Sequence, residues 1–230
     1  MKNLVIISTV GASLLTNYAR YVKADPHRFL DSIDSLSENE LKSLEKSIIE
    51  YLLSLGDRFI EASAELNSIM DILRTLDISA VKEIELMFVI SDTKQGQLIA
   101  EVLMEFINRH IKKFCDKDLK VYYDVIEGLN YKDIEHATKG LPLLAARIAT
   151  WIKNKKSLGH EVILNITGGF KAESIFVAMV GLLARIPVYY MHEKFRKAIR
   201  LPPLVTELSG EYEILLEIIK SFYDSYVRSD

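Results

Sequence analysis

The residues of this chain best suited to chemistry lie in one stretch, Asn165-Ile166-Thr167-Gly168-Gly169-Phe170-Lys171. It follows an apolar run at 161–164 and precedes an apolar helical pattern, so the sequence predicts a strand, a tight turn and a helix. Two glycines allow close approach of a bound group, and the first amides of a helix are donors at the positive end of its dipole. An anion is therefore the expected guest, with Lys171 beside it. The alternative is that the glycines only turn the chain and Lys171 is solvated.

Three further loops of small polar residues follow predicted strands, at 8–13, 91–97 and 127–133. Repeated strand-then-helix units predict an α/β fold with a mostly parallel sheet flanked by helices. The carboxyl ends of such strands meet at one edge, which is the ligand side of a doubly wound sheet. An ordinary helix cap also explains the loop at 91–97. The residues that this edge would collect are Ser8, Thr9, Gly11, Ser13, Thr93, Lys94, Gln95, Gln97, Asn130, Thr167, Gly168, Gly169 and Lys171.

Residues 25–80 interrupt the strand-and-helix alternation with helical periodicity, including a capping box that starts at Ser37. We expect this helical insertion to cover the sheet, with a regulatory or dimer role as the alternative. A further strand at 186–192 is expected to turn back as a hairpin. We therefore divide the chain into a domain at 1–203, which includes the insertion, and a C-terminal helical extension at 204–230.

Composition excludes several classes of protein. The chain has 230 residues, 49% hydrophobic and 27% charged, with a net charge of −3, which argues against a basic face for duplex DNA or RNA. Its single cysteine, Cys115, excludes an internal disulfide, and its five histidines lack zinc spacing, so no metal is expected. No apolar run approaches the roughly 18 residues of a membrane span, and no signal-peptide region follows Met1. We expect a cytoplasmic protein with no membrane partner.

Familiar catalytic and nucleotide-binding fingerprints are missing from the sequence. There is no G-x-x-x-x-G-K-[ST] and no G-x-G-x-x-G with an acidic ribose partner. Clustered carboxylates for two metals, and Ser-His-Asp or Cys-His sets on matched loops, are also missing. The predicted ligand edge therefore offers hydroxyl groups, amides and Lys171.

Four motifs in order along the chain resemble the CARF domains of type III CRISPR systems, and most closely the stand-alone archaeal-type ring nucleases. They are residues 7–17, Ser91-Asp92-Thr93 with Gly96, residues 165–171 and residues 189–193. The resemblance covers about 1–203. It implies a Rossmann-like homodimer that binds cyclic oligoadenylate, usually the tetra-adenylate, across its two-fold axis. Ring nucleases cleave that ring without a metal or other cofactor, to linear di-adenylate with a 2′,3′-cyclic phosphate.

The resemblance also implies roles for single residues. A ribose 2′-OH is already tethered beside its own 3′-phosphodiester, so the enzyme must hold the bond in line and stabilise the developing charge. Lys171 would supply the charge, and Ser13, with its neighbours Thr9 and Ser8 as the alternatives, would position a ribose hydroxyl or phosphate oxygen. The lack of a histidine pair implies slow turnover. The expected ligand contacts are Ser8, Thr9, Gly11, Asn17, Thr93, Lys94, Gln95, Gln97, Asn130, Thr167, Gly168 and Gly169.

Two other functions remain open from the sequence. The first is a CARF sensor that binds the ring without cutting it and signals to an effector. Residues 204–230 offer one helix and no effector module, which favours the enzyme unless the chain is a fragment of a longer protein. The second is a Rossmann-like domain whose polar edge binds another nucleotide.

Overall fold

The strands expected from the sequence are present in the computed structural model, which describes residues 2–110, 114–130, 134–192 and 196–203. Its strands are β1 (Lys2–Thr9), β2 (Val81–Ser91), β3 (Asp118–Ile126), β4 (Glu161–Asn165), β5 (Val188–Met191) and β6 (Ala198–Arg200). Its helices are α1 (Ser13–Tyr21), α2 (Pro26–Ile33), α3 (Glu38–Ser54), the 3-10 helix η1 (Gly56–Glu61), α4 (Ala64–Thr75), α5 (Lys94–Arg109), α7 (Ile134–Ser157) and α8 (Lys171–Leu183).

The strands form one sheet in the order β3-β2-β1-β4-β5-β6, parallel except for β6. This is the strand order of a Rossmann-like fold, which confirms the predicted α/β class. The chain leaves β1 toward β2 and later returns on the other side through β4, so the topological switch point lies between β1 and β4. The β5–β6 hairpin is also confirmed. The expected C-terminal helix lies in 204–230, outside the described residues.

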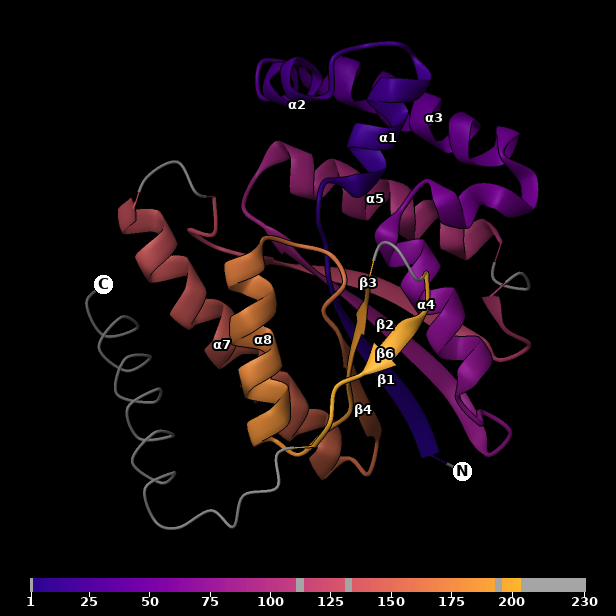
Figure 1. Ribbon diagram of the computed structural model, residues 1–230, viewed down its shortest axis with the longest axis vertical. Helices are drawn as coiled ribbons and strands as arrows, with labels where there is room; N and C mark the ends of the chain where they lie inside the picture. Colours follow the sequence, from indigo (N-terminus) through magenta and orange to yellow (C-terminus); the bar gives the residue numbers. More distant parts are fainter. Residues whose placement is uncertain (1, 111–113, 131–133, 193–195, 204–230) are drawn as a thin grey trace.

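Alternate residues of the central strands face opposite sides of the sheet and pack into two apolar cores. Leu4 and Ile6 of β1 contribute to the core with α1, α3, α4 and α5. Val5 and Ile7 contribute to the core with α7 and α8. Figure 1 shows α7 and α8 on one face and α4 on the other. Burial on both faces explains why β1 is a continuous apolar run rather than an alternating one.

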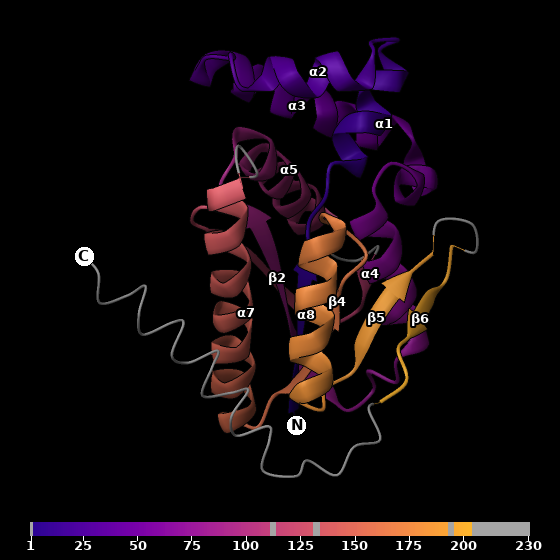
Figure 2. The same cartoon turned by 60° about the vertical axis from the view of Figure 1, so that its left-hand side comes forward.

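The helical insertion covers the sheet, as expected, and also extends past its edge. Buried residues of α3 and α4, including Leu52 and Ile69, belong to the same core as β1. Figure 2 shows α2 and α3 lying beyond the end of the sheet at which α1 begins. The side-chain nitrogen of Lys94 joins this part to α5, because it donates to the carbonyl oxygens of Asp34 at 2.9 Å and Leu36 at 2.8 Å.

Helix α7 is amphipathic and anchored at its C-terminal end. Lys155 donates to the carboxylate of Glu85 on β2, and the Tyr122 hydroxyl of β3 donates to the same oxygen at 2.9 Å. Burial alone would raise the pKa of Glu85, but these hydrogen bonds and the charge of Lys155 lower it below its ordinary value of 4.5.

Throughout the described ranges, no helix is both long enough and apolar enough to cross a membrane.

Candidate functional site

The carboxyl ends of β1 and β4 are joined at the switch point by buried polar side chains. Ser8 pairs with Asn165 in the strand register. The Asn165 amide nitrogen donates to the hydroxyl oxygens of Ser8 at 2.9 Å and Ser68 at 2.8 Å. Thr167 donates to the Asn165 side-chain oxygen at 2.6 Å and accepts from the Met191 amide at 3.1 Å. Each buried polar group thus has a partner inside the protein, which holds the two strand ends together.

Ser8, Thr9 and Thr167, which the sequence predicts as ligand contacts, are held in this network and lie outside the lining of the hollow described below. Ser8 is 0% exposed and Thr9 is 2% exposed. The Thr9 hydroxyl donates to the carbonyl oxygen of Gly168 at 2.5 Å, and the Thr167 hydroxyl is engaged by Asn165 and Met191. These hydroxyls form hydrogen bonds that support the loops from inside the protein. Ser8 and Thr9 are buried and expose almost no surface.

The first-strand loop and the glycine turn lie against each other. A Cβ on Gly11 would stand 2.6 Å from the amide nitrogen of Gly169, so the two backbones are in direct contact. Gly169 has a φ of +93°, a conformation that favours glycine. A Cβ on Gly168 would meet the Glu65 carboxylate at 2.1 Å and the carbonyl oxygen of Thr9 at 2.8 Å. Both glycines of the turn are thus required by the geometry.

Glu65, at the start of α4, is a central residue that the sequence did not indicate. It is 0% exposed, and its carboxylate accepts from the Gly11 amide at 2.8 Å, the Ser13 hydroxyl at 3.1 Å and the Ser63 hydroxyl at 2.6 Å. An acidic residue in the first turn of a helix is so common that Ser63-Ala64-Glu65 gives no distinct signal. Glu65 brings the helical insertion into the site.

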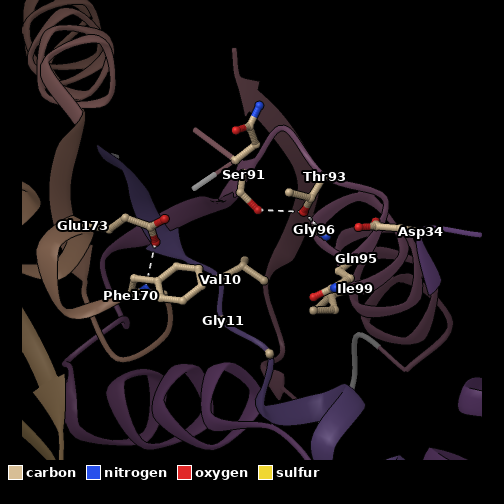
Figure 3. A pocket seen from close by; sticks show the side chains of 13 residues that line it. Val10, Gly11, Asp34, Ser91, Thr93, Gln95, Gly96, Ile99, Phe170 and Glu173 are labelled. Carbon is tan, nitrogen blue, oxygen red and sulfur yellow. Dashed lines mark hydrogen bonds between the residues drawn. The ribbon is translucent and has the colours of Figure 1, made fainter. Parts of the chain in front are cut away.

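A hollow of about 260 Å³ lies beside these loops, at the carboxyl edge of the sheet. All the loops expected to converge there contribute to it, through Gly11, Thr93, Asn130 and Gly169. Figure 3 shows Phe170 and Glu173 on one side, Gln95 and Asp34 on the other, and Val10 and Gly11 between them. The complete lining is Val10, Gly11, Ala12, Asp34, Ser91, Thr93, Gln95, Gly96, Ile99, Asn130, Gly169, Phe170 and Glu173.

The hollow is acidic, whereas the sequence predicted a site for an anion. Asp34 and Glu173 are the ionisable side chains among its described lining residues, and both are acidic. Glu173 accepts from the Phe170 amide at 3.0 Å, so a carboxylate of the protein already sits at the start of α8. Val10, Ile99 and Phe170 add apolar surface. The hollow suits a flat, uncharged group with hydrogen-bond donors better than it suits a phosphate.

Lys171 and Ser13, the predicted catalytic pair, lie outside the lining of the hollow. Lys171 is the first residue of α8; it is exposed, and its side chain makes no hydrogen bond or ion pair with any residue that the structure describes. Ser13 begins α1 and is half-buried, one residue beyond the lining residue Ala12. The Ser13 hydroxyl donates to Glu65 and accepts from the Ala64 amide at 2.9 Å.

Asn17 faces the helical insertion. Its side-chain nitrogen donates to the carbonyl oxygen of Ala62 at 3.1 Å, and its side-chain oxygen accepts from Arg20 at 2.9 Å. Asn17 is therefore placed to support α1 and is not part of the lining of the hollow.

The loop at the start of α5 combines the two roles that the sequence allowed. Thr93 caps α5 by accepting from the Gly96 amide at 3.0 Å, and it also lines the hollow. Gln95 lines the hollow while its side-chain nitrogen donates to the carbonyl oxygen of Leu30 at 3.0 Å. The Lys94 side chain is hydrogen-bonded to the insertion, and Gln97 is exposed and lies outside the lining.

The loop after β3 is tied to the α5 loop. The Asp92 amide donates to the carbonyl oxygen of Leu129 at 3.2 Å, and the Gly128 amide donates to the Asp92 carboxylate at 3.4 Å. These contacts bring Asn130 to the hollow. The remainder of this loop, 131–133, lies outside the described residues.

Comparison with known proteins gives one family and several distant structures. The family model described as CRISPR-associated protein (Cas_APE2256) matches residues 60–204, more than half of the chain. Protein VC1899 from Vibrio cholerae is 9% identical with a TM-score of 0.40, over 89% of this chain and 34% of its own.

Two further structures were solved with cyclic nucleotides. Can2 from Sulfobacillus thermosulfidooxidans, in complex with cyclic tetra-adenylate, is 9% identical with a TM-score of 0.34, over 88% of this chain and 39% of its own. Enterococcus italicus Csm6, bound to cyclic hexa-2′-fluoro-hexa-dAMP, is 14% identical with a TM-score of 0.35, over 100% of this chain and 39% of its own. The present chain thus spans less than two fifths of each of these structures.

Proposed function

The chain belongs to the CRISPR-associated family Cas_APE2256, and on this basis we propose that it binds cyclic tetra-adenylate and cleaves it. The observation that carries the proposal is the hollow at the β1–β4 switch point. It is built from the loops whose motifs resemble ring nucleases, including Gly11, Thr93 and Gly169. A switch point of a doubly wound sheet is the expected place for a nucleotide.

The hollow is suited to an adenine base. Val10, Ile99 and Phe170 offer apolar surface for the faces of the base, and Phe170 is 60% exposed. The carboxylate of Asp34 is an acceptor for the exocyclic amine of adenine. With the base in the hollow, the phosphates would lie at its rim, where Lys171 is the exposed cation.

We propose that the ring is shared by a homodimer. A volume of about 260 Å³ is below the roughly 300–1,000 Å³ of typical ligand pockets and leaves room for only part of a cyclic tetranucleotide. Helix α8, beside the hollow, exposes Ile175 (58%), Phe176 (36%) and Met179 (50%). An apolar surface of this kind is typical of protein interfaces. A two-fold axis through this surface would combine two hollows around one ring.

The proposed reaction is an internal transesterification. The ribose 2′-oxygen loses its proton and attacks the adjacent phosphorus; the bond from phosphorus to the 5′-oxygen breaks, and that oxygen takes up a proton. Each cut leaves a 2′,3′-cyclic phosphate and a 5′-hydroxyl, so opposed cuts give two linear di-adenylates. Lys171 would stabilise the charge that develops on phosphorus, and Ser13 would position the ribose hydroxyl.

Incubation of the purified chain with cyclic tetra-adenylate in EDTA, followed by chromatography, tests the proposal. We expect slow conversion to linear di-adenylate with a cyclic phosphate. Conversion that appears only when a divalent metal is added would contradict the metal-independent mechanism.

A sensor that binds the ring without cutting it is the second candidate. Its support is that the Ser13 hydroxyl is already engaged by Glu65 and Ala64 and that the lining of the hollow is acidic. Retention of the ring without conversion would favour the sensor. Failure to bind the ring would favour a third candidate, a domain for another nucleotide.

A further inference from the structure

Glu65 joins two loops that the proposed reaction would need in fixed positions. Its carboxylate accepts from the Gly11 amide and the Ser13 hydroxyl of the first-strand loop. One of its oxygens also lies against Gly168 of the glycine turn that leads to Lys171, where a Cβ would meet it at 2.1 Å. The carboxylate belongs to α4 of the insertion and is completely buried.

Capping of α4 does not account for this arrangement. Ser63 already serves as the cap of α4, because its hydroxyl accepts from the Leu66 amide at 3.3 Å. Burying a carboxylate is costly unless it is fully hydrogen-bonded. Two of the three donors to Glu65 come from the loop at Gly11 and Ser13, so the acid holds that loop as well as its own helix.

The contacts of Ser13 restrict what its hydroxyl can offer a ligand. A serine hydroxyl has one proton to donate and two lone pairs that accept. The proton is directed to Glu65 at 3.1 Å, and one lone pair receives the Ala64 amide at 2.9 Å. One lone pair remains. In this state Ser13 can accept a hydrogen bond from a ribose hydroxyl, but it cannot donate one to a phosphate oxygen.

We propose that Glu65 is a positioning residue that keeps Ser13 in the acceptor state, so that Ser13 orients the attacking 2′-OH. This inference rests on the proposed cleavage of cyclic tetra-adenylate. It assigns the helical insertion a part in the reaction, since Glu65 acts through Ser13 and touches no reacting atom.

The substitution Glu65→Gln tests the inference by replacing the carboxylate oxygen that accepts from Ser13 and Ser63 with a donor. The Gly11 amide requires an acceptor, which directs the new side-chain oxygen toward Gly11 and the new NH₂ group toward Ser13. Ser13 would then accept from both this NH₂ group and the Ala64 amide, and its proton would turn outward. We expect cleavage to slow by about 10²-fold, with the dissociation constant for the ring little changed.

A double-mutant cycle separates this role from general support of the fold. If Glu65 acts through Ser13, the Ser13→Ala variant loses a similar factor, and adding Glu65→Gln to it costs little more. The matched control is Glu40→Gln, the same change at the exposed start of α3, where the carboxylate accepts from Ser37 and does not contact the site. We expect the control to cleave near the wild-type rate. The inference would be overturned if the rate losses of the two single variants multiplied in the double variant. It would also be overturned if a folded Glu65→Gln protein cleaved at the wild-type rate.

A second measurement uses only the wild type and Ser13→Ala, in case Glu65→Gln does not fold. A ring that lacks the 2′-OH has no proton for Ser13 to accept. We expect this deoxy ring to bind the wild type several-fold more weakly than the ribose ring, and Ser13→Ala to bind both alike; equal binding of both rings by the wild type would overturn the inference. Wild-type cleavage is measured first, so that its absence identifies a failure of the proposed function itself.

Discussion

Among the glycines that the structure describes, Gly168 has the least room for a side chain. A Cβ at this position would lie 2.8 Å from both the Gly11 amide nitrogen and the Thr9 carbonyl oxygen, besides meeting Glu65. Because the first two are backbone atoms, they cannot move aside without displacing β1. Gly168→Ala should therefore lower the free energy of unfolding by about 1–3 kcal/mol. It should also weaken ring binding, because it separates the loops around the hollow; urea unfolding and calorimetry measure the two effects.

Gly181 provides the control for that substitution. A Cβ there would meet side-chain atoms of Leu164 and Val188 at 2.6 Å, in the core between α8 and the sheet. Gly181→Ala should lose stability of the same order, about 1–3 kcal/mol, and keep its affinity for the ring. If both variants lost affinity equally, the effect of Gly168 on binding would be a general loss of structure.

Replacing Lys171 should affect cleavage and leave stability unchanged. It is exposed and has no partner among the described residues, so Lys171→Ala should leave the melting temperature unchanged. Cleavage of cyclic tetra-adenylate should fall by about 10²–10³-fold, because a charge that stabilises the transition state is removed. The control is Lys153→Ala, an exposed lysine of α7, which should cleave normally. Wild-type cleavage by Lys171→Ala would remove this residue from the mechanism.

At the scale of elements, the anchor of α7 on the sheet makes stability depend on pH. The pKa of Glu85 is lowered in the folded protein, so its stabilising contribution is present above the unfolded value of about 4.5 and is lost as the pH falls through the lower folded value. Lys155→Met should therefore lower the free energy of unfolding by about 1–3 kcal/mol at pH 7. The difference from wild type should narrow at acid pH, where Glu85 is protonated. Urea unfolding across this range measures both.

The ion pair between Lys120 and Glu83 is the matched control for the ion pair that anchors α7. Their side chains lie 2.8 Å apart, but that of Lys120 is 67% exposed. Lys120→Met should cost much less stability than Lys155→Met, because an exposed pair is screened by water and salt. An equal loss in the two variants would contradict the anchoring role of Glu85.

The helical insertion contributes residues to the candidate site. It supplies Asp34 to the lining of the hollow and Glu65 to the first-strand loop. It is also bound to the start of α5 through Lys94 and Gln95. A movement of α2 or α4 would therefore reach the hollow directly. An element whose apolar residues cover the sheet therefore also helps to form the hollow.

At the scale of the whole molecule, the proposal requires a dimer. Met179→Lys places a charge in the exposed apolar surface of α8, so light scattering should show a shift from dimer to monomer. Ring affinity should fall with it, since each subunit then holds only part of the ring. Leu158→Lys, at a residue of similar character that is 68% exposed just beyond the end of α7, should leave the mass unchanged. A dimeric mass for Met179→Lys would place the interface elsewhere.

The strands and the edge that carries the site could be predicted from the sequence, because both depend on local signals. A continuous apolar run such as Leu4-Val5-Ile6-Ile7 predicts a strand buried on both faces, and parallel strands bring their carboxyl ends to one edge. Gly168 and Gly169 likewise predicted a tight turn. Convergence of the loops at Gly11, Thr93, Asn130 and Gly169 followed from these two rules.

Only the tertiary structure decided which polar groups line the hollow. Ser8 lies near the end of β1 and Gln97 in the first turn of α5, and the first is buried while the second is exposed. The sequence could not show that Glu65 reaches Gly11 and Ser13, which precede it by more than 50 residues. Nor could it show that Glu173 occupies the start of α8. A carboxylate has the same local pattern whether it caps a helix or joins two loops, and only packing selects between these roles.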